Sequence, residues 1–342
     1  MRILAGVLTT LALTAGLATA APAAATAERS AAYAVNDDGI IIGSVGDAAA
    51  RWDTGGSLGK LETLPNSIVT HANGINGSGT IVGTDYVGDQ QQVAVRWDAD
   101  GAISELGGHD AVYSSARAVN DAGVTVGDIG GFTSGSAVRW DGEGRLARLD
   151  TPSGYVRATA RAVNDSGAIA GYLSTGGSEP GTNRTRAVRW NSDGAATILP
   201  GLPDGGSSYA LGIGRDGTVI GEAEDAAGNG HAVRWDGNGD LTRLATLPGD
   251  TVSSASAIND DGVIVGYTTT PDRARVHPVR WDGNGTVREL ATRPGDTSGV
   301  AEGINGSGVI VGYTLDGDRT ATAVRWNRDG TIGELGGNRG TP

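Results

Sequence analysis

The stretch HAVRWDGNGDLTRLATLPGD, residues 231–250, contains the pattern that decides the fold. A short alternating segment ends in Trp-Asp, a glycine-rich turn follows, and a second short segment leads to a Pro-Gly bend. Alternation with a period of two is typical of a half-buried β-strand, and Asp-Gly is typical of a tight hairpin turn. The stretch therefore predicts two antiparallel strands joined by a hairpin.

This unit occurs seven times along the chain. Each tryptophan follows an arginine and precedes Asp or Asn, successive tryptophans are 43 to 50 residues apart, and the sequence contains no other tryptophan. A period in this range indicates a propeller or a solenoid. The tryptophans are Trp52, Trp97, Trp140, Trp190, Trp235, Trp281 and Trp326.

A second motif precedes each tryptophan and reads AINDDGVIVG at 257–266. It contains an Asn, a Gly three residues later and another Gly four residues after that, which we interpret as strand, four-residue turn, strand. Asn can bond the backbone two residues on, and the first Gly can take the left-handed conformation that closes a hairpin. Gly214 replaces the Asn in the fifth copy; the others are Asn36, Asn76, Asn120, Asn164, Asn259 and Asn305.

The strand before this turn has one face of small residues. Alanine lies four residues before the turn position in every copy, and Ala or Gly lies two residues before it. Residues two apart on a strand share a face, so something must approach that face closely. We predict that a tryptophan from the adjoining unit fills the space.

Four short strands per unit, without helical periodicity, predict an all-β fold: a seven-bladed β-propeller of four-stranded antiparallel blades. A solenoid would need shorter repeats and distinct capping units, and neither is visible. The ring could close by packing alone or by pairing of the segment before Ala31 with the last blade. We place the propeller at 31–337, with repeats at about 31–66, 67–110, 111–154, 155–204, 205–250, 251–296 and 297–337.

Loop lengths indicate which face is free to vary. The spacing from each Trp to the next turn Gly is 26 or 27 residues, whereas the spacing from the second Gly to the Trp ranges from 9 to 19. Insertions are therefore tolerated only between the second and third strands. We predict that these loops and the crossings between blades form the binding face.

The two ends of the chain lie outside the repeats. Residues 1–20 have a basic start at Arg2, an apolar run and small residues before Ala21, which is the layout of a secretory signal peptide. We assign 21–30 to a linker and 338–342 to a tail. A secreted protein, extracellular or associated with the cell surface, is therefore expected.

Composition limits the function classes. The 342-residue chain has no cysteine, which excludes disulfides, thiol catalysis and thiolate metal sites. The net charge of −13 argues against nucleic acid and anionic membranes as partners, because both select for clustered positive charge. No second apolar stretch follows the first 20 residues, so we expect no membrane insertion. We predict a monomer.

The repeat resembles that of the HAF-repeat family of extracellular bacterial proteins and, more distantly, that of WD-repeat propellers. HAVRW at 231–235 keeps the His and Ala of His-Ala-Phe-x-Trp, with Val233 in place of the Phe. GINGSGVIVG at 303–312 and GELGG at 333–337 fit the rest of the family pattern. The resemblance covers 31–337 and implies a secreted bacterial propeller, with no catalytic residues to carry over.

Aromatic and polar side chains near the loops are the candidate binding residues. Tyr172, Tyr267 and Tyr313 each follow the second Gly of a repeat. Aromatic faces beside polar groups suit saccharides; the alternative is that these tyrosines are strand formers packed at blade rims. The candidate set is Tyr86, His109, Asp110, Tyr172, Glu222, Tyr267, Asp272 and Tyr313.

Other polar positions have simpler interpretations. His231 and His277 share a slot that other repeats fill with unrelated residues, and DGNGD at 236–240 fits a hairpin turn better than a calcium loop. We assign no catalytic residue, metal ligand or cofactor. The arginines before the tryptophans could form an anion-binding ring, but we interpret them as structural partners of the Asp or Asn after the Trp, or of the turn Asn. They are Arg51, Arg96, Arg139, Arg189, Arg234, Arg280 and Arg325.

Two functions fit these observations. The main hypothesis is a non-catalytic binding module for an extracellular glycan or protein. The alternative is an enzyme, a glycosidase or lyase, acting on extracellular polysaccharide through loop carboxylates such as Glu179, Glu222, Glu224 and Asp272. An enzyme should show Asp, Glu, His or Tyr clustered at the mouth of the channel. The innermost strands hold few titratable groups: Glu302, His71, Arg117, Arg157 and Arg161.

Overall fold

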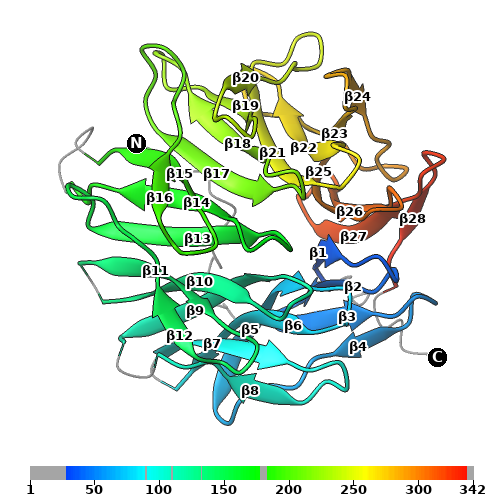
Figure 1. The fold of residues 1–342 in the computed structure, drawn as a ribbon. Coiled ribbons are helices and arrows are strands. Elements are labelled where there is room, and N and C mark those ends of the chain that lie inside the picture. Colours follow the sequence, from blue (N-terminus) through cyan, green and yellow to red (C-terminus); the bar gives the residue numbers. More distant parts are fainter. Residues whose placement is uncertain (1–27, 89–90, 109–110, 132, 178–182, 337–342) are drawn as a thin grey trace, which may run out of the picture.

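The computed structural model describes residues 28–88, 91–108, 111–131, 133–177 and 183–336. Within these ranges the chain forms 28 β-strands and no helix (Figure 1). The described residues accordingly include no helix long and apolar enough to cross a membrane. The all-β prediction is confirmed.

The strands recur in sets of four along the chain, here called repeats 1 to 7. The first strands are β1 (Ser30–Val35), β5 (Ser67–Ile75), β9 (Tyr113–Val119), β13 (Arg157–Val163), β17 (Ser208–Ile213), β21 (Val252–Ile258) and β25 (Ser298–Ile304). The second strands are β2 (Ile41–Val45), β6 (Ile81–Val87), β10 (Thr125–Gly130), β14 (Ile169–Ser174), β18 (Val219–Glu224), β22 (Ile264–Thr269) and β26 (Ile310–Leu315). The third strands are β3 (Ala48–Trp52), β7 (Gln91–Trp97), β11 (Gly135–Trp140), β15 (Thr185–Trp190), β19 (Gly230–Trp235), β23 (Val276–Trp281) and β27 (Ala321–Trp326). The fourth strands are β4 (Leu58–Lys60), β8 (Ile103–Glu105), β12 (Leu146–Arg148), β16 (Ala196–Ile198), β20 (Leu241–Arg243), β24 (Val287–Glu289) and β28 (Ile332–Glu334).

Consecutive strands of a repeat pair antiparallel. Repeats 1, 5, 6 and 7 each form a separate four-stranded sheet, whereas β5 to β16 form one twelve-stranded sheet. The twelve strands are joined across repeats only by two single parallel pairs, Gln92 with Tyr113 and Gly135 with Arg157. No sheet closes on itself among the described strands.

The seven first strands surround a common axis. Each contacts the first strand of the next repeat, and β25 contacts β1, which completes the circle. Figure 1 shows β1 beside β26 and β27, so the two ends of the repeat array lie side by side. The short fourth strands lie on the outside of the ring (Figure 1).

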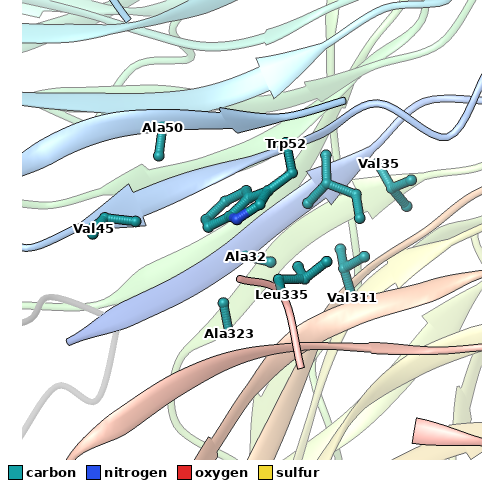
Figure 2. Close-up of a cluster of buried hydrophobic side chains, with 9 residues drawn as sticks. Ala32, Val35, Val45, Ala50, Trp52, Val311, Ala323 and Leu335 are labelled. Atoms are coloured by element: carbon teal, nitrogen blue, oxygen red, sulfur yellow. The ribbon is translucent and has the colours of Figure 1, made fainter. Parts of the chain in front are cut away.

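The tryptophans fill the spaces between successive repeats, and all seven are fully buried, with 0 % of their surface exposed. Figure 2 shows one such core, in which Trp52 packs with Ala32 and Ala50 of its own sheet and with Val311 and Ala323 of repeat 7. The predicted arrangement, in which an alanine face receives the tryptophan of an adjoining unit, is therefore wrong.

The physical reason is the register of the sheet. Gly43 pairs with Ala32 on one side and with Ala50 on the other, so the three form a row of small residues across the sheet. Trp52 lies two residues beyond Ala50 and therefore on the same face. The indole covers this row of its own sheet, and the neighbouring repeat contributes aliphatic side chains instead.

The second glycine of each motif accommodates a β-bulge. In repeat 5 the register shifts between Ala210 and Gly212, so Leu211 has no cross-strand partner. A Cβ on the opposite Gly221 would lie 2.0 Å from the carbonyl oxygen of Tyr209. The other six repeats have the same bulge, with equivalent distances of 1.9 to 2.1 Å. Only glycine fits this close approach of two backbones.

The first glycine of each motif has a different role, because it closes the hairpin. It adopts a positive φ of 72 to 84° in all seven repeats, as predicted. The Asn side chain differs from the prediction, because its Oδ1 accepts the N–H four residues on rather than two. In repeat 3, for example, Val124 donates to Asn120 Oδ1 at 2.9 Å.

The turn asparagines also link the repeats into a ring. Asn120 Nδ2 donates to the carbonyl oxygen of Asn164 at 3.0 Å, and five further asparagines make the same bond at 2.9 to 3.1 Å. The link from repeat 5 to repeat 6 is the exception, because Gly214 has no side chain. We call these residues the turn ring: Asn36, Asn76, Asn120, Asn164, Gly214, Asn259 and Asn305.

The junction of repeats 7 and 1 uses the same contacts as the other junctions. Asn305 Nδ2 donates to the carbonyl oxygen of Asn36 at 3.0 Å, and Trp52 Nε1 donates to that of Gly336 at 2.9 Å. Ser30, which precedes Ala31, contributes through its hydroxyl, which accepts the N–H of Ala323 at 3.0 Å. Side-chain hydrogen bonds and packing therefore close the ring, because β1 pairs only with β2.

Candidate axial binding site

The bulged residues differ in every repeat. Because the bulges lie on the strands that surround the axis, their side chains emerge from the innermost part of each sheet. All seven are partly exposed. They are Tyr33, Asn73, Arg117, Arg161, Leu211, Ser256 and Glu302.

A second set of side chains follows the second glycine of each repeat and lies next to the bulged residues. Arg117 Nε donates to Asp128 Oδ1 at 2.7 Å, and the Tyr33 hydroxyl lies 2.9 Å from Ser44 Oγ. The members are Ser44, Thr84, Asp128, Tyr172, Glu222, Tyr267 and Tyr313.

Electrostatic interactions connect the two sets across the axis. Burial raises the pKa of Glu302, and the Arg161 charge opposes this rise although the two residues come from repeats 4 and 7. The Glu302 charge in turn raises the pKa of both Tyr267 and Tyr313. We call the titratable residues of the two sets the axial cluster: Tyr33, Arg117, Asp128, Arg161, Tyr172, Glu222, Tyr267, Glu302 and Tyr313.

The acidic side of the axial cluster contains two carboxyl groups that titrate near neutral pH. Burial raises the pKa of Glu302 to about 7, and the Arg161 charge offsets only part of that effect. Burial also raises the pKa of Glu222 to about 7, with a hydrogen bond from Ser254 opposing the shift. Each carboxyl can therefore serve as a hydrogen-bond donor or as an acceptor around pH 7.

The tyrosines on this side are held neutral. Burial raises the pKa of Tyr267 well above its usual range, and the charges of Glu222 and Glu302 raise it further. Tyr313 shows the same shift, caused by burial and then by Glu302. Both hydroxyls remain protonated over the whole physiological range and can donate a hydrogen bond.

The basic side holds two arginines on the adjacent strands β9 and β13. Burial opposes the charge of Arg117, but Asp128 together with the nearby Tyr172 and Tyr113 raises the arginine pKa. Arg161 shows the opposite shift, because burial and then the nearby Arg117 lower its pKa. Arg161 Nε is buried and has no hydrogen-bond partner among the described residues.

Four of the predicted binding residues belong to the axial cluster: Tyr172, Glu222, Tyr267 and Tyr313. Tyr86 does not, since its ring packs edge-on against His71 with the centroids 5.7 Å apart. Asp272 forms an exposed turn, in which its Oδ1 accepts the Thr270 hydroxyl at 2.6 Å and the Ala274 N–H at 3.0 Å. His109 and Asp110 lie outside the described residues.

The carboxylates suggested for an enzyme also fall into those that belong to the axial cluster and those that do not. Glu222 reaches the axis, whereas Glu224 accepts the N–H of Ser207 at 2.8 Å at the end of β18. Glu179 lies outside the described residues. The candidate set omitted Tyr33, Arg117, Asp128, Arg161 and Glu302. Position was the available signal, because the bulged residue lies three residues before every turn position.

The histidines of the shared slot each make a hydrogen bond to an aspartate. His231 Nε2 lies 2.8 Å from Asp225 Oδ2, and this bond lowers the pKa of Asp225 to about 2. His277 Nδ1 lies 2.8 Å from Asp250 Oδ2. Neither pair belongs to the axial cluster.

Four of the seven arginines before the tryptophans bind the next repeat. Arg51, Arg96 and Arg189 each donate to a carbonyl oxygen in the next third-to-fourth-strand turn, at 3.2, 3.1 and 3.0 Å. Arg139 makes the equivalent bond to Ser192. The predicted partner, the Asp after the Trp, is found at Arg280, which binds Asp282 at 2.7 Å. The role is structural, but the partner was predicted wrongly for these four arginines.

The DGNGD turn behaves as a hairpin. Asp236 Oδ1 accepts the N–H groups of Asn238 and Asp240, both at 2.9 Å. The carboxylate is thus occupied by its own turn. Among the described residues, no three His, Asp or Glu side chains converge in an arrangement that could hold a metal ion.

The surface has two hollows that are not lined by residues of the axial cluster. One of about 500 Å³ is lined mainly by glycines and apolar residues of repeat 3, including Val112 and Ile129, and its Arg148 is bound to Ser136 at 2.5 Å. The other, of about 220 Å³, lies at the axis and is surrounded by the turn ring. Within the described part of the chain, neither hollow is lined by a residue with a buried, unpartnered polar atom such as Arg161 Nε.

Three exposed apolar side chains mark the crossing face, the face that carries the second-to-third-strand loops and the crossings between repeats. Ile68, Val112 and Val156 occupy the same position, eight residues before the turn asparagine, in repeats 2, 3 and 4. They are 58, 50 and 43 % exposed, and they lie just before or at the start of a first strand. Repeats 2 to 4 therefore present an apolar rim on this face.

Comparison with known proteins identifies the fold. No protein-family model matches the sequence, and no curated protein sequence matches it. The β-propeller domain of the Trilobed protease from Pyrococcus furiosus, described as having an open velcro topology, matches with a TM-score of 0.61 and 14 % identity, over 92 % of this chain and 98 % of that one. Virginiamycin B lyase from Staphylococcus aureus matches with a TM-score of 0.55 and 12 % identity, over 91 % and 95 %.

Puromycin hydrolase matches with a TM-score of 0.63 and 16 % identity. The match covers 92 % of this chain but 54 % of the hydrolase, so this chain spans about half of that protein. At such identities the likeness concerns the fold alone. The chain has a β-propeller fold.

Proposed function

We propose that this chain is a secreted, monomeric seven-bladed β-propeller of four-stranded blades that binds an extracellular saccharide at the axial cluster. The blade count is supported by the seven sets of four strands and by the contact of β25 with β1. The HAF-repeat resemblance, with its repeats at 31–337, and the signal peptide at 1–20 belong to the same proposal. The bacterial and extracellular assignments rest on them.

The observation that carries the binding site is the variety of chemistry at one structural position. Seven equivalent bulges hold seven side chains that include Tyr33, Arg161 and Glu302, although one residue type would suffice for packing. A saccharide needs a surface for stacking and groups that donate and accept hydrogen bonds. Tyrosine rings supply the surface, and the neutral hydroxyls, protonatable carboxyls and guanidinium groups supply the donors and acceptors.

The ligand enters from the crossing face in this proposal. On the opposite face, the turn asparagines are bonded to one another's backbone and surround a hollow of only about 220 Å³. The crossing face instead carries the exposed Ile68, Val112 and Val156, whose apolar surface suits the C–H faces of sugar rings.

A glycan array on the mature protein tests the proposal, followed by titration calorimetry on the best ligand. We expect Tyr313→Phe and Glu222→Gln to weaken binding at least tenfold. Tyr155→Phe, a half-buried tyrosine outside the axial cluster, should leave affinity within twofold of the wild type. An array without signal would refute saccharide binding, and full affinity in both axial variants would refute the axial site. Retention of a protein ligand instead would also contradict the proposal.

One observation favours an enzyme as the second candidate. Two carboxyls with pKa values of about 7, Glu222 and Glu302, lie with tyrosines in one cluster, which is the signature expected of an acid–base site. If the protein is a hydrolase or lyase, it should release new chain ends from the polysaccharide that it binds. Glu302→Gln should then abolish release while binding persists. A wild-type protein that binds but releases nothing leaves the binding module as the function.

A further inference from the structure

The charge at the axis is divided between two sides. Arg117 and Arg161 come from repeats 3 and 4, whose first strands are in contact. Glu222 and Glu302 come from repeats 5 and 7. Burial disfavours the charged form of Arg161, and repulsion by the neighbouring Arg117 disfavours it further. Both effects lower the pKa of Arg161.

The carboxylate on the basic side is already occupied. Asp128 is buried, with 4 % of its surface exposed, and it binds Arg117 at 2.7 Å. Arg161 makes no comparable pair: its Nε is buried and unpartnered among the described residues. A buried N–H without an acceptor is unfavourable, because the group has lost its hydrogen bond to water and has no replacement for it.

Glu302 compensates Arg161 only in part. The Asp128 charge also acts on Arg161, but Asp128 is bound to Arg117. Burial raises the pKa of the Glu302 carboxyl to about 7, so its charge is not retained throughout the neutral range. The arginine thus keeps a positive charge that no fully ionised, hydrogen-bonded partner in the described part of the chain neutralises. That charge stands out in a chain with a net charge of −13.

We propose that Arg161 binds the carboxylate of an acidic saccharide, so that the ligand of the axial cluster is a uronate-bearing glycan. A guanidinium presents parallel N–H groups that match the two oxygens of a carboxylate. Arg117 adds a second positive charge on the neighbouring strand, while the tyrosines and carboxyls opposite contact the neutral hydroxyls of the sugar. This inference rests on the proposed function, since it specifies the class of saccharide.

The test is a glycan array on which each uronate oligosaccharide is printed beside its carboxyl-reduced counterpart, which has the same linkages and no charge. We expect the acidic member of the best pair to bind at least tenfold more tightly in titration calorimetry at pH 6.5. Equal binding of the two members, or binding confined to neutral saccharides, would overturn the inference and leave the proposed function intact. An array without any signal would overturn both.

Variants locate the effect at Arg161. Arg161→Gln should remove the preference for the acidic member, and Arg161→Lys should retain part of it because the charge remains. Arg145→Gln is the matched control, because Arg145 pairs with Asp141 at 2.7 Å in the exposed turn between β11 and β12 and should leave the preference unchanged. A preference that persists in Arg161→Gln would assign the carboxylate to another residue and overturn the inference. If that variant does not fold, the comparison of Arg161→Lys with the wild type decides.

Discussion

The turn ring and the bulged residues of the axial site lie on the same seven hairpins, three positions apart, and they differ in one respect. In the turn ring the same side chain makes the same two hydrogen bonds in six repeats, and every amide is used for linking neighbours. The bulged position instead holds a different side chain in each repeat, apart from the two arginines.

This difference separates structure from function. A position that the ring geometry requires has one preferred side chain, and six of the seven repeats share it. The bulged position needs no particular side chain, because the bulge and its opposing glycine depend on the backbone alone. Side-chain chemistry at that position is therefore free to serve a ligand. Substitutions at repeated positions should destabilise the protein, and a substitution at the variable position should not.

The largest loss is expected at a tryptophan. Trp235→Ala removes a fully buried indole and the bond from Nε1 to the carbonyl oxygen of Pro200 at 2.7 Å. We expect the free energy of unfolding to fall by about 3–5 kcal/mol, measured by urea denaturation. Trp235→Phe keeps most of the apolar surface and should lose clearly less. A loss below about 1 kcal/mol for the alanine variant would mean that the cores between repeats do not hold the ring together.

A slightly smaller loss is expected from adding one methyl group. In Gly221→Ala the new Cβ would lie 2.0 Å from the carbonyl oxygen of Tyr209, so the bulge must open. We expect a loss of about 3 kcal/mol, seen as a lower midpoint in urea. Gly237→Ala is the matched control, because no atom lies within 4 Å of its Cβ position. Equal stability of the two variants would show that the bulge is not required.

The turn ring should contribute less at each position. Asn120→Ala removes the bond from the Val124 N–H and the bond to the carbonyl oxygen of Asn164. We expect the free energy of unfolding to fall by about 1–3 kcal/mol, since one buried group loses its partner at each end. Asn238→Ala, at an exposed hairpin residue, should change stability little. Wild-type stability of the Asn120 variant would contradict the proposed linking role.

The smallest effect is expected at the axial cluster, and its sign is opposite. Glu302 has a folded-state pKa of about 7 against an ordinary value near 4.5, so the folded state resists ionisation. The penalty is absent below about pH 4.5, grows as the pH rises towards 7, and stays constant above that. Because the Glu302 side chain is partly exposed, solvent screening reduces the destabilisation that its ionisation causes.

Glu302→Gln removes this penalty. We expect the variant to be about 1 kcal/mol more stable than the wild type at pH 8 and equal to it at pH 4.5, measured by thermal unfolding at both values. Glu289→Gln, an exposed glutamate on the outer strand β24, should show no such difference between the two pH values. A destabilised Glu302→Gln at pH 8 would show that the variable position also serves the fold.

Much of the fold was predictable because its causes are local. The period of two, the turn glycines and the spacing of the tryptophans all act within a few residues, and they correctly predicted an all-β chain of short strands with buried indoles. Three details were predicted wrongly, and one is the turn asparagine, whose Oδ1 accepts the N–H four residues on rather than two. Trp52 packs over Ala32 because of the pairing register across three strands of the sheet. The hydrogen-bond partners of Arg51 and Arg96 lie in the next repeat.

The candidate site was predictable only in part, for a related reason. Tyr172, Tyr267 and Tyr313 stood out because they follow a repeated glycine, and the structure places them at the axis. Arg161 and Glu302 belong to the site only because a bulge exposes them and because the ring brings repeats 4 and 7 to opposite sides of one axis.

The sequence by itself determined the repeat, the order of the strands, the buried tryptophans and the left-handed turn glycines, because period-two patterning and backbone conformation depend on neighbours along the chain. The tertiary structure alone decided which side chains share the axis and which charges remain uncompensated there. Those properties depend on distances between residues more than a hundred positions apart, and such distances exist only once the ring has closed.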